Sequence, residues 1–207
     1  MRQERATRTR RTLLDAAAGV FDRDGYEGAS LTRVAQAADT SLGALTFHFA
    51  SKEHLAREVG EQGCATTRAA LTDLPAHPVS SLDWLAPYTL ALTGLLDRDP
   101  AVRAAARLTR ELLWTAPNWY AAWQPALRER LADVSPAELP PGADPSTLTA
   151  LAAHLVAGAE TWARHQAYHP DAREQGCLSS TEDVARILRL VLDSGPAGAH
   201  PTGVRRG

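Results

Sequence analysis

Apolar residues recur at helical spacing along the chain, and no run of alternating apolar and polar β-branched residues interrupts them. Recurrence at every third or fourth position gathers apolar side chains on one face of a helix, so the pattern predicts an all-α fold. Leu13, Ala17, Val20 and Phe21 form such a face in a first helix. Gly25 is expected to end this helix, because glycine readily takes the left-handed conformation at a helix terminus.

Three further helices are predicted in the first third of the chain. Ser30 is a suitable N-cap for a second helix whose inner face includes Val34. A short turn over residues 38–41 leads to a third helix, and Asp39 suits a left-handed position in that turn. Ser51 can cap a fourth helix that extends to about residue 72.

The rest of the chain predicts five more helices, for about nine in all. They are expected at about 81–97, 101–115, 118–132, 146–168 and 181–193. Proline breaks the pattern at residues 74–80, and residues 135–145 hold four prolines and are expected to form a loop. We therefore predict an N-terminal domain over residues 1–50, a helical domain over 51–194 with helix 51–72 connecting the two, and a disordered tail over 195–207.

Charge is distributed unevenly along the chain, although the net charge is only −2. Residues 1–11 contain five arginines and one glutamate, so the remaining residues are acidic overall. A basic arm on an acidic body favours a polyanionic partner at one end. The two cysteines, Cys64 and Cys177, lack a metal-type spacing and suggest a reducing compartment. The chain has no signal peptide and no apolar segment of membrane-spanning length, so a cytoplasmic location is expected.

The predicted third helix separates into two faces at about 100° per residue. Leu45 and Phe49 point inward. The outward set is Leu42, Gly43, Thr46 and Phe47. An exposed leucine and phenylalanine so close together are unusual on a protein surface. In the major groove of DNA they can contact thymine methyl groups, which predicts a helix-turn-helix. The alternative is a plain three-helix core with an untidy outer face.

The arm strengthens the DNA-binding interpretation, because its arginines can neutralise phosphates or enter a minor groove. Lys52, beside the Ser51 cap, would add a cation at a helix N-terminus that faces a phosphate. The residues predicted to contact a double-stranded DNA operator are Arg8, Arg10, Arg11, Ser30, Thr32, Arg33, Thr40, Ser41, Leu42, Gly43, Ala44, Thr46, Phe47, His48 and Lys52.

Three motifs in residues 2–59 carry a family resemblance. They are the opening RQERA-x-RTR, the F-D-x-x-G-Y segment and the run G-A-L-x-F-H-F-x-S-K-E. This region resembles the DNA-binding domain of TetR-family repressors, and most closely the γ-butyrolactone receptors and pseudo-receptors of actinomycetes. The resemblance implies a dimeric repressor that binds a pseudo-palindromic operator. It also implies release by a small, mostly apolar lactone, furan or antibiotic-like effector, and control of secondary metabolism.

The sequence departs from the family pattern on the DNA-facing side. Relatives usually carry Tyr at the position of Thr46, and often Lys at Leu42 and Gly at Asp39. Loss of a phenol and a cation predicts weaker or altered operator binding, with the arm carrying more of the affinity.

The second domain contains all five tryptophans, which lie beyond residue 80. Ordinary core packing accounts for any single one of them, but their clustering favours a mostly apolar cavity with a few polar anchors. The resemblance implies that a tryptophan here lines the ligand pocket, and Trp123 matches best. The predicted ligand-binding residues are Trp84, Thr109, Trp119, Trp123, Thr161, Trp162 and Gln166.

The last two predicted helices carry apolar stripes that suit a homodimer interface. One stripe comprises Leu148, Leu151, Leu155, Ala159 and Trp162, and the other comprises Val184, Ile187, Leu188 and Val191. Part of each stripe must also pack within the chain. A two-fold dimer would place two recognition helices about 34 Å apart, one turn of DNA.

Two alternatives remain open. His165 and His169 are four residues apart, with His154 upstream, but the zincin pattern is absent and no third ligand is evident, so no metal or other cofactor is expected. The sequence also lacks nucleophile-elbow and nucleotide-binding motifs, which argues against a small hydrolase and leaves no catalytic residue assigned. The other alternative is a ligand-binding dimer with weakened or lost DNA binding.

Overall fold

The computed structural model describes residues 2–74, 82–112, 117–169 and 179–192. Within these ranges it contains nine α-helices, two short 3₁₀ helices and no strand, which confirms the all-α prediction. The elements are α1 (Arg2–Gly28), α2 (Leu31–Ala37), α3 (Leu42–His48), α4 (Lys52–Thr72), α5 (Leu85–Arg98), α6 (Pro100–Glu111), η1 (Tyr120–Ala122), α7 (Gln124–Ala132), η2 (Pro136–Glu138), α8 (Pro145–Tyr168) and α10 (Ser180–Leu192).

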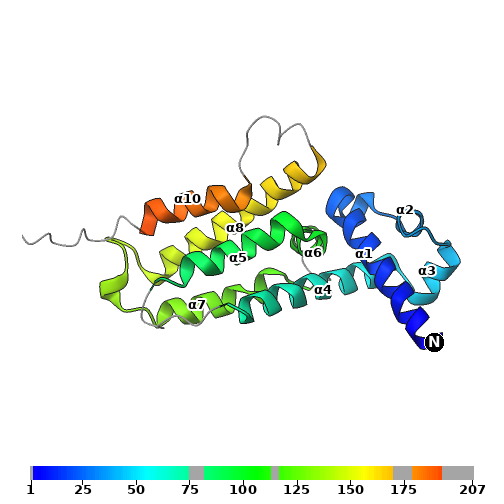
Figure 1. Ribbon diagram of the computed structural model, residues 1–207, viewed down its shortest axis with the longest axis horizontal. Coiled ribbons are helices and arrows are strands. Elements are labelled where there is room, and N and C mark those ends of the chain that lie inside the picture. The colour runs from blue at the N-terminus through cyan, green and yellow to red at the C-terminus, as the bar shows by residue number, and fades with distance from the viewer. Residues whose placement is uncertain (1, 75–81, 113–116, 170–178, 193–207) are drawn as a thin grey trace, which may run out of the picture.

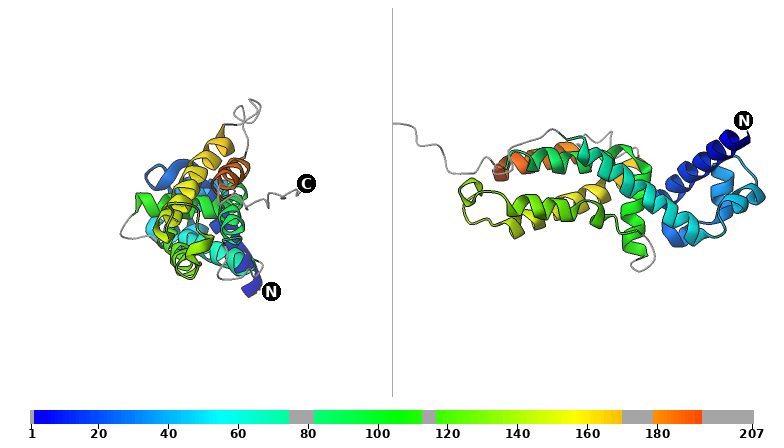
Figure 2. Two further views of the ribbon diagram at one scale, coloured as in Figure 1. Left: turned by 90° about the vertical axis from the view of Figure 1, so that its left-hand side faces the viewer. Right: turned by 90° about the horizontal axis from the view of Figure 1, so that it is seen from below.

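The helices form an elongated molecule with the N-terminal helices at one end (Figure 1). We call helices α1–α3 the head and the helices from α4 onward the body. Helix α4 leaves the head and runs along the body, and α8 and α10 lie side by side on the body (Figures 1 and 2). The far end of α8 approaches α1, so the head is adjacent to two separate parts of the body.

Gly25 breaks α1, as the sequence predicts. Its φ of 73° lies in the left-handed region, and one more helical turn follows it. A Cβ atom at this position would lie 2.6 Å from an Arg107 nitrogen and 2.6 Å from a Glu111 oxygen. The positive φ therefore favours glycine, and a Cβ atom here would also displace the ends of the Arg107 and Glu111 side chains.

Two apolar cores stabilise the fold. The first contains Leu13, Phe21, Leu45 and Phe49 from the head, together with the start of α4 and one face of α6. The second lies in the body and is built from α5 to α10, with fully buried tryptophans. The first core is thus completed by residues from the body, since Leu108 of α6 is fully buried in it.

Helices α4 and α6 cross at very short distance at Gly63. A Cβ atom there would lie 2.5 Å from the Ala101 carbonyl oxygen and 2.5 Å from the Ala105 Cβ. Contacts this short do not occur in folded proteins, so only glycine permits the crossing. The crossing holds α6 against both α4 and the head.

Helix boundaries in the body differ from the predictions in three places. The predicted helix over 101–115 ends at Glu111, and Leu112 is its non-helical C-cap. The predicted helix over 118–132 is divided into η1 and α7, because the Asn118 side chain turns the chain by accepting the N–H groups of Tyr120 and Ala121. The predicted helix over 81–97 begins only at residue 85. The expected tail from residue 195, most of the 74–80 break, Trp114 and Cys177 lie outside the described residues.

Candidate nucleic-acid interface and ligand site

Helices α2 and α3 form a capped helix-turn-helix. The Ser30 hydroxyl accepts a hydrogen bond from the Arg33 backbone N–H at 3.2 Å, and the Ser41 hydroxyl accepts one from the Ala44 N–H at 3.1 Å. The Ser30 cap matches the sequence prediction, and the Ser41 cap is found by the structure at the end of the predicted turn. Asp39 adopts a φ of 49° between them, as expected for the turn.

Helix α3 presents an apolar outer face at the end of the head (Figure 1). Leu45 and Phe49 are fully buried, whereas Phe47 is 83% exposed and Leu42 is 45% exposed. The predicted division of this helix into two faces is therefore confirmed. The outer face is open to a partner, and the apolar groups on it can contact thymine methyl groups in a major groove.

Hydrogen-bonding groups on the outer face are few. The Thr46 hydroxyl donates within its own helix, with the Leu42 and Gly43 carbonyl oxygens at 3.0 and 3.2 Å. His48 is half-buried, with its ring edge-on to Phe47 at 5.3 Å. The helix contains no Arg, Lys, Asn or Gln, so the bidentate contacts that usually read bases are not available from it.

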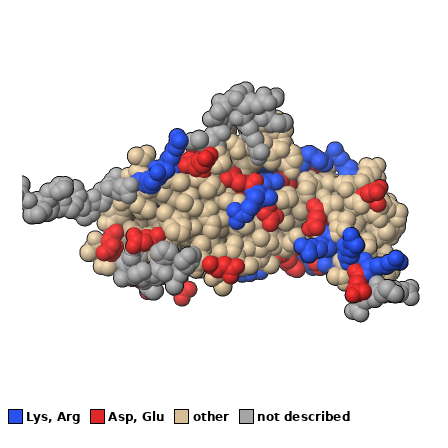
Figure 3. Space-filling model, in the orientation of Figure 1, with Lys and Arg blue, Asp and Glu red and all other residues tan. Residues whose placement is uncertain are grey.

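Cations gather on α1. Arg5, Arg8 and Arg11 follow one another at three-residue spacing, are exposed, and have no protein partner among the described residues. Basic side chains cluster at this end of the molecule, as Figure 3 shows. Arg10 is used differently, since it donates to Glu58 at 2.5 Å and lies over the Phe49 ring at 5.1 Å. The pKa of Glu58 is lowered, chiefly by this hydrogen bond.

Two of the residues predicted to contact phosphates pair with groups of the protein itself. The Lys52 ammonium donates to the Tyr26 and Ala29 carbonyl oxygens at 3.0 and 3.3 Å, and it also lies over the Tyr26 ring. Arg33 pairs with Asp24 at 3.3 Å. Both side chains contact residues near the break in α1, and the sequence does not reveal these contacts. Of the other predicted contacts, Ser30, Thr32, Ser41 and Gly43 are exposed, whereas Thr40 and Ala44 are half-buried.

Three aromatic residues form a buried group in the body. Trp84 packs edge-on against Tyr88, and the Tyr88 hydroxyl donates to the Trp123 carbonyl oxygen at 2.7 Å. Burial raises the pKa of Tyr88 to about 12, so its hydroxyl stays protonated. The indole N–H groups of Trp84 and Trp123 are buried and have no hydrogen-bond partner among the described residues. A buried unpaired donor is costly, so these two groups would gain from an acceptor supplied by a ligand.

Trp119 is equally buried but is fully bonded within the protein. Its indole N–H donates to the Thr67 hydroxyl at 2.8 Å, and its backbone N–H donates to the Thr109 hydroxyl at 2.9 Å. Thr109 in turn donates to the Ala105 carbonyl oxygen. The structure therefore brings two of the predicted ligand residues together, but in a network that supports the aromatic group.

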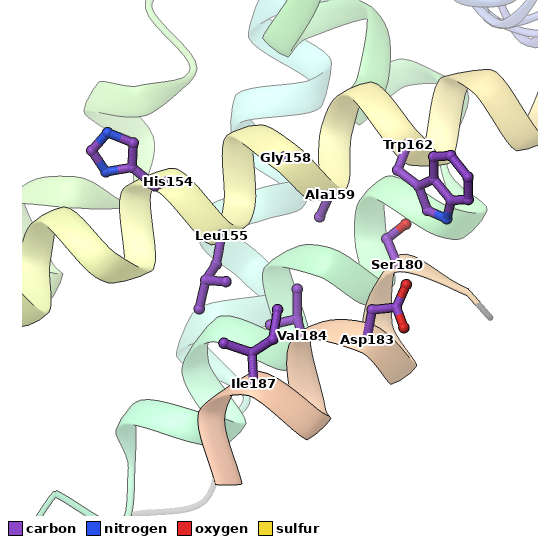
Figure 4. A pocket seen from close by; sticks show the side chains of 9 residues that line it. All are labelled: His154, Leu155, Gly158, Ala159, Trp162, Ser180, Asp183, Val184 and Ile187. Carbon is purple, nitrogen blue, oxygen red and sulfur yellow. The ribbon is translucent and has the colours of Figure 1, made fainter. Parts of the chain in front are cut away.

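A separate groove lies between α8 and α10 (Figure 4). It encloses about 230 Å³ and is lined by Leu155, Ala159, Trp162, Val184 and Ile187, among others. Trp162 thus lines this groove, and neither Trp84 nor Trp123 does. Thr161 is exposed on α8 and donates to its own helix, while Gln166 is buried. The seven predicted ligand residues therefore do not line a single pocket. They are divided among the aromatic group, the network around Trp119, and helix α8.

A buried polar cluster between head and body had no signal in the sequence. Asp22 of α1 is fully buried and accepts hydrogen bonds from the Arg103 Nε of α6 and the Tyr168 hydroxyl of α8, both at 2.7 Å. Its partners are 81 and 146 residues away in the chain. Because no local spacing relates such residues, only the three-dimensional fold reveals the cluster.

The histidines give no sign of a metal site in the described part of the chain. No group of three or more His, Cys, Asp or Glu side chains is close enough there to hold an ion. The rings of His165 and His169 are 4.7 Å apart, but His154 lies elsewhere on α8 and contacts the Ala150 carbonyl oxygen. Among the described helices, none is both long and apolar enough to cross a bilayer.

Together, a capped helix-turn-helix with an open outer face and an all-helical body define a transcriptional regulator of the helix-turn-helix class. Residues 13–59 match the model of the bacterial regulatory proteins of the tetR family. The A-factor receptor protein of Streptomyces griseus is 29% identical over 202 residues, which cover 97% of this chain and 67% of that protein.

Solved structures agree with this relationship. A γ-butyrolactone receptor described as ArpA-like is 33% identical, with a TM-score of 0.66 over 77% of this chain and 76% of its own. The TetR-family protein CprB from Streptomyces coelicolor, solved with its biological operator sequence, is 28% identical, with a TM-score of 0.67 over 93% of this chain and 99% of its own. The chain belongs to the TetR family.

Proposed function

We propose that this protein is a cytoplasmic, ligand-responsive repressor that binds a pseudo-palindromic operator as a homodimer. A small, mostly apolar effector with a polar group, such as a lactone, a furan or an antibiotic-like molecule, releases it from DNA and relieves repression of secondary-metabolism genes. The observation that carries this proposal is the outward face of α3, where Phe47 is 83% exposed beside Leu42 on a Ser41-capped helix.

The proposal divides DNA binding between two elements. The exposed arginines of α1 (Arg5, Arg8 and Arg11) supply sequence-independent attraction to phosphates. The outer face of α3 supplies apolar contact with base edges, where thymine methyl groups offer the best match. Operator affinity would then depend strongly on salt, with modest discrimination among bases.

The effector site is proposed at the aromatic group of the body. The unpaired indole N–H groups of Trp84 and Trp123 suit a ligand that presents a carbonyl or ether oxygen within an apolar frame. Relatives named as receptors for A-factor and γ-butyrolactones support a ligand of this chemistry. Trp119 and Thr109, which are hydrogen-bonded to each other, would support the aromatic group and would not contact the ligand.

The homodimer is proposed to form through α8 and α10. Ile187 is 40% exposed and Leu190 is 73% exposed on α10, next to the groove lined by Leu155 and Trp162. A second copy of the same two helices would cover these apolar groups in a four-helix arrangement. The two-fold axis would present two α3 helices to successive major grooves.

The first test is a gel shift with the DNA upstream of the protein's own gene, at low salt. Binding that an organic extract of the producing culture releases supports the proposal. Absence of a shift would favour the alternative, a ligand-binding dimer without DNA binding. The reason to consider this alternative is that Thr46 replaces the tyrosine usual in the family. Steady hydrolysis of a lactone or ester would instead point to an enzyme.

The second test locates the effector. Trp123→Phe keeps an aromatic ring but removes one unpaired N–H, and we expect about tenfold more effector to be needed for release. Trp162→Phe replaces an indole by a phenyl ring in the α8–α10 groove and should leave the amount of effector needed for release unchanged. The reverse result would move the effector site to the groove.

A further inference from the structure

A buried carboxylate joins the head to the end of α8. Asp22 has no solvent exposure, and a single oxygen, Oδ2, accepts both the Arg103 Nε and the Tyr168 hydroxyl at 2.7 Å. Its other oxygen, Oδ1, makes no hydrogen bond and faces the Arg164 Nε at 3.9 Å. Arg164 is itself paired with Glu160, a fully buried residue one turn earlier on α8. Hydrogen bonds to a buried charge are strong and directional, so this cluster fixes α1 against α8.

Helix α8 carries this cluster and the groove on opposite faces. The groove side includes Leu155, Ala159 and Trp162. The cluster side includes Glu160, Arg164 and Tyr168. At about 100° per residue the mean directions of these two sets differ by roughly 180°. One rigid helix therefore contacts the proposed dimer partner on one side and the DNA-binding head on the other.

We propose that Tyr168 and Arg164 are positioning residues for operator binding. By holding Asp22, they orient the head on α8, and α8 in turn sets the distance between the two α3 helices of the dimer. The proposal rests on the dimeric DNA-binding function above, and it adds a direct route from the dimer interface to the head that bypasses α4. Without the Tyr168 hydroxyl, Asp22 keeps its bond to Arg103 of α6 but only the longer ion pair with Arg164 on α8, so α8 holds the head less firmly.

Two variants that each remove one hydroxyl form the pair for the test. Tyr168→Phe removes a hydroxyl that donates over 2.7 Å from the body to the head. Thr89→Val removes a fully buried hydroxyl that donates over 2.9 Å to the Leu85 carbonyl oxygen, entirely within the body and outside the proposed effector site. Each variant loses one hydrogen bond. A general loss of stability would therefore affect both, whereas loss of head orientation would affect only Tyr168→Phe.

The DNA readout is the preference for half-site spacing. The upstream operator is footprinted, and duplexes are made with its two half-sites at the natural spacing and one base pair closer or farther apart. The wild type and Thr89→Val should discriminate strongly against altered spacing, while Tyr168→Phe should lose about tenfold of that discrimination. Equal discrimination by the two variants would overturn the proposal.

A measurement without DNA separates this inference from the proposed function. Nitroxide labels at Glu27→Cys, an exposed head position, report the distance between the two heads of the dimer once Cys64 and Cys177 are changed to serine. Tyr168→Phe should broaden the distance distribution, and Thr89→Val should not. Equal widths would overturn the positioning role even where the wild type binds its operator. A wild type that neither dimerises nor binds DNA would instead refute the proposed function and this role with it.

Discussion

Replacement of Arg8 and Arg11 by glutamine tests the division of DNA binding most directly. Both side chains are exposed on α1 and have no partner in the described structure, so their removal should leave the fold unchanged. A dimer would lose four cations. Because each neutralised phosphate contributes about −0.9 to the slope of log affinity against log salt, the slope should become shallower by about 3 to 4. A fourfold rise in salt would then weaken the variant about a hundredfold less than the wild type.

The assay is fluorescence anisotropy with a labelled operator duplex, titrated at several KCl concentrations. The control is Arg68→Gln with Arg128→Gln, which removes the same charge from exposed positions of α4 and α7 in the body. We expect the control to retain the wild-type slope. If the α1 variant also retains it, or if both variants change alike, the arginines of α1 do not contact phosphates and the reasoning is wrong.

Three other outcomes follow from the structure. Thr46→Tyr should tighten operator binding about tenfold, because a phenol can reach a phosphate where the threonine hydroxyl is bonded to its own helix; unchanged affinity at fixed salt would contradict this. Gly63→Ala should cost about 1 to 3 kcal/mol of unfolding free energy by overpacking the α4–α6 crossing, whereas Gly19→Ala, with open space around it, should not destabilise; thermal melting compares the two. The lowered pKa of Glu58 means that its pairing with Arg10 stabilises the fold fully above the ordinary value of 4.5 and is lost as pH falls through the lowered pKa; the difference in melting temperature between wild type and Glu58→Gln should therefore shrink in acid, and a constant difference would count against it.

Local features of the head could be predicted from the sequence because their causes are local. Ser30, Ser41 and Ser51 each cap the helix that follows, and a cap depends on residues only three positions away. The two faces of α3 follow from helical periodicity in the same way. Asp39 takes the left-handed conformation that the short turn requires.

Two departures from prediction involve contacts distant in sequence. Lys52 was expected to face a phosphate. Its ammonium instead donates to backbone carbonyl oxygens near the end of α1, where the helix is interrupted at Gly25. Trp119 was expected to line a cavity, but Thr67 of α4 takes its indole N–H. In each case the side chain bonds to a partner that no periodic pattern in the sequence identifies. The sequence therefore singles out the residue but not the contact that it makes in the fold.

The shared first core has a consequence for protein engineering. Leu108 and Ala104 of α6 are fully buried among head residues such as Phe21. A chimaera that exchanges residues 2–50 between two regulators would therefore place a new head on a foreign α6 surface, with cavities or clashes where these side chains meet. An exchange of DNA specificity in this protein should therefore transfer all residues of the first core. The inner face of α6 would be moved together with the recognition helix α3.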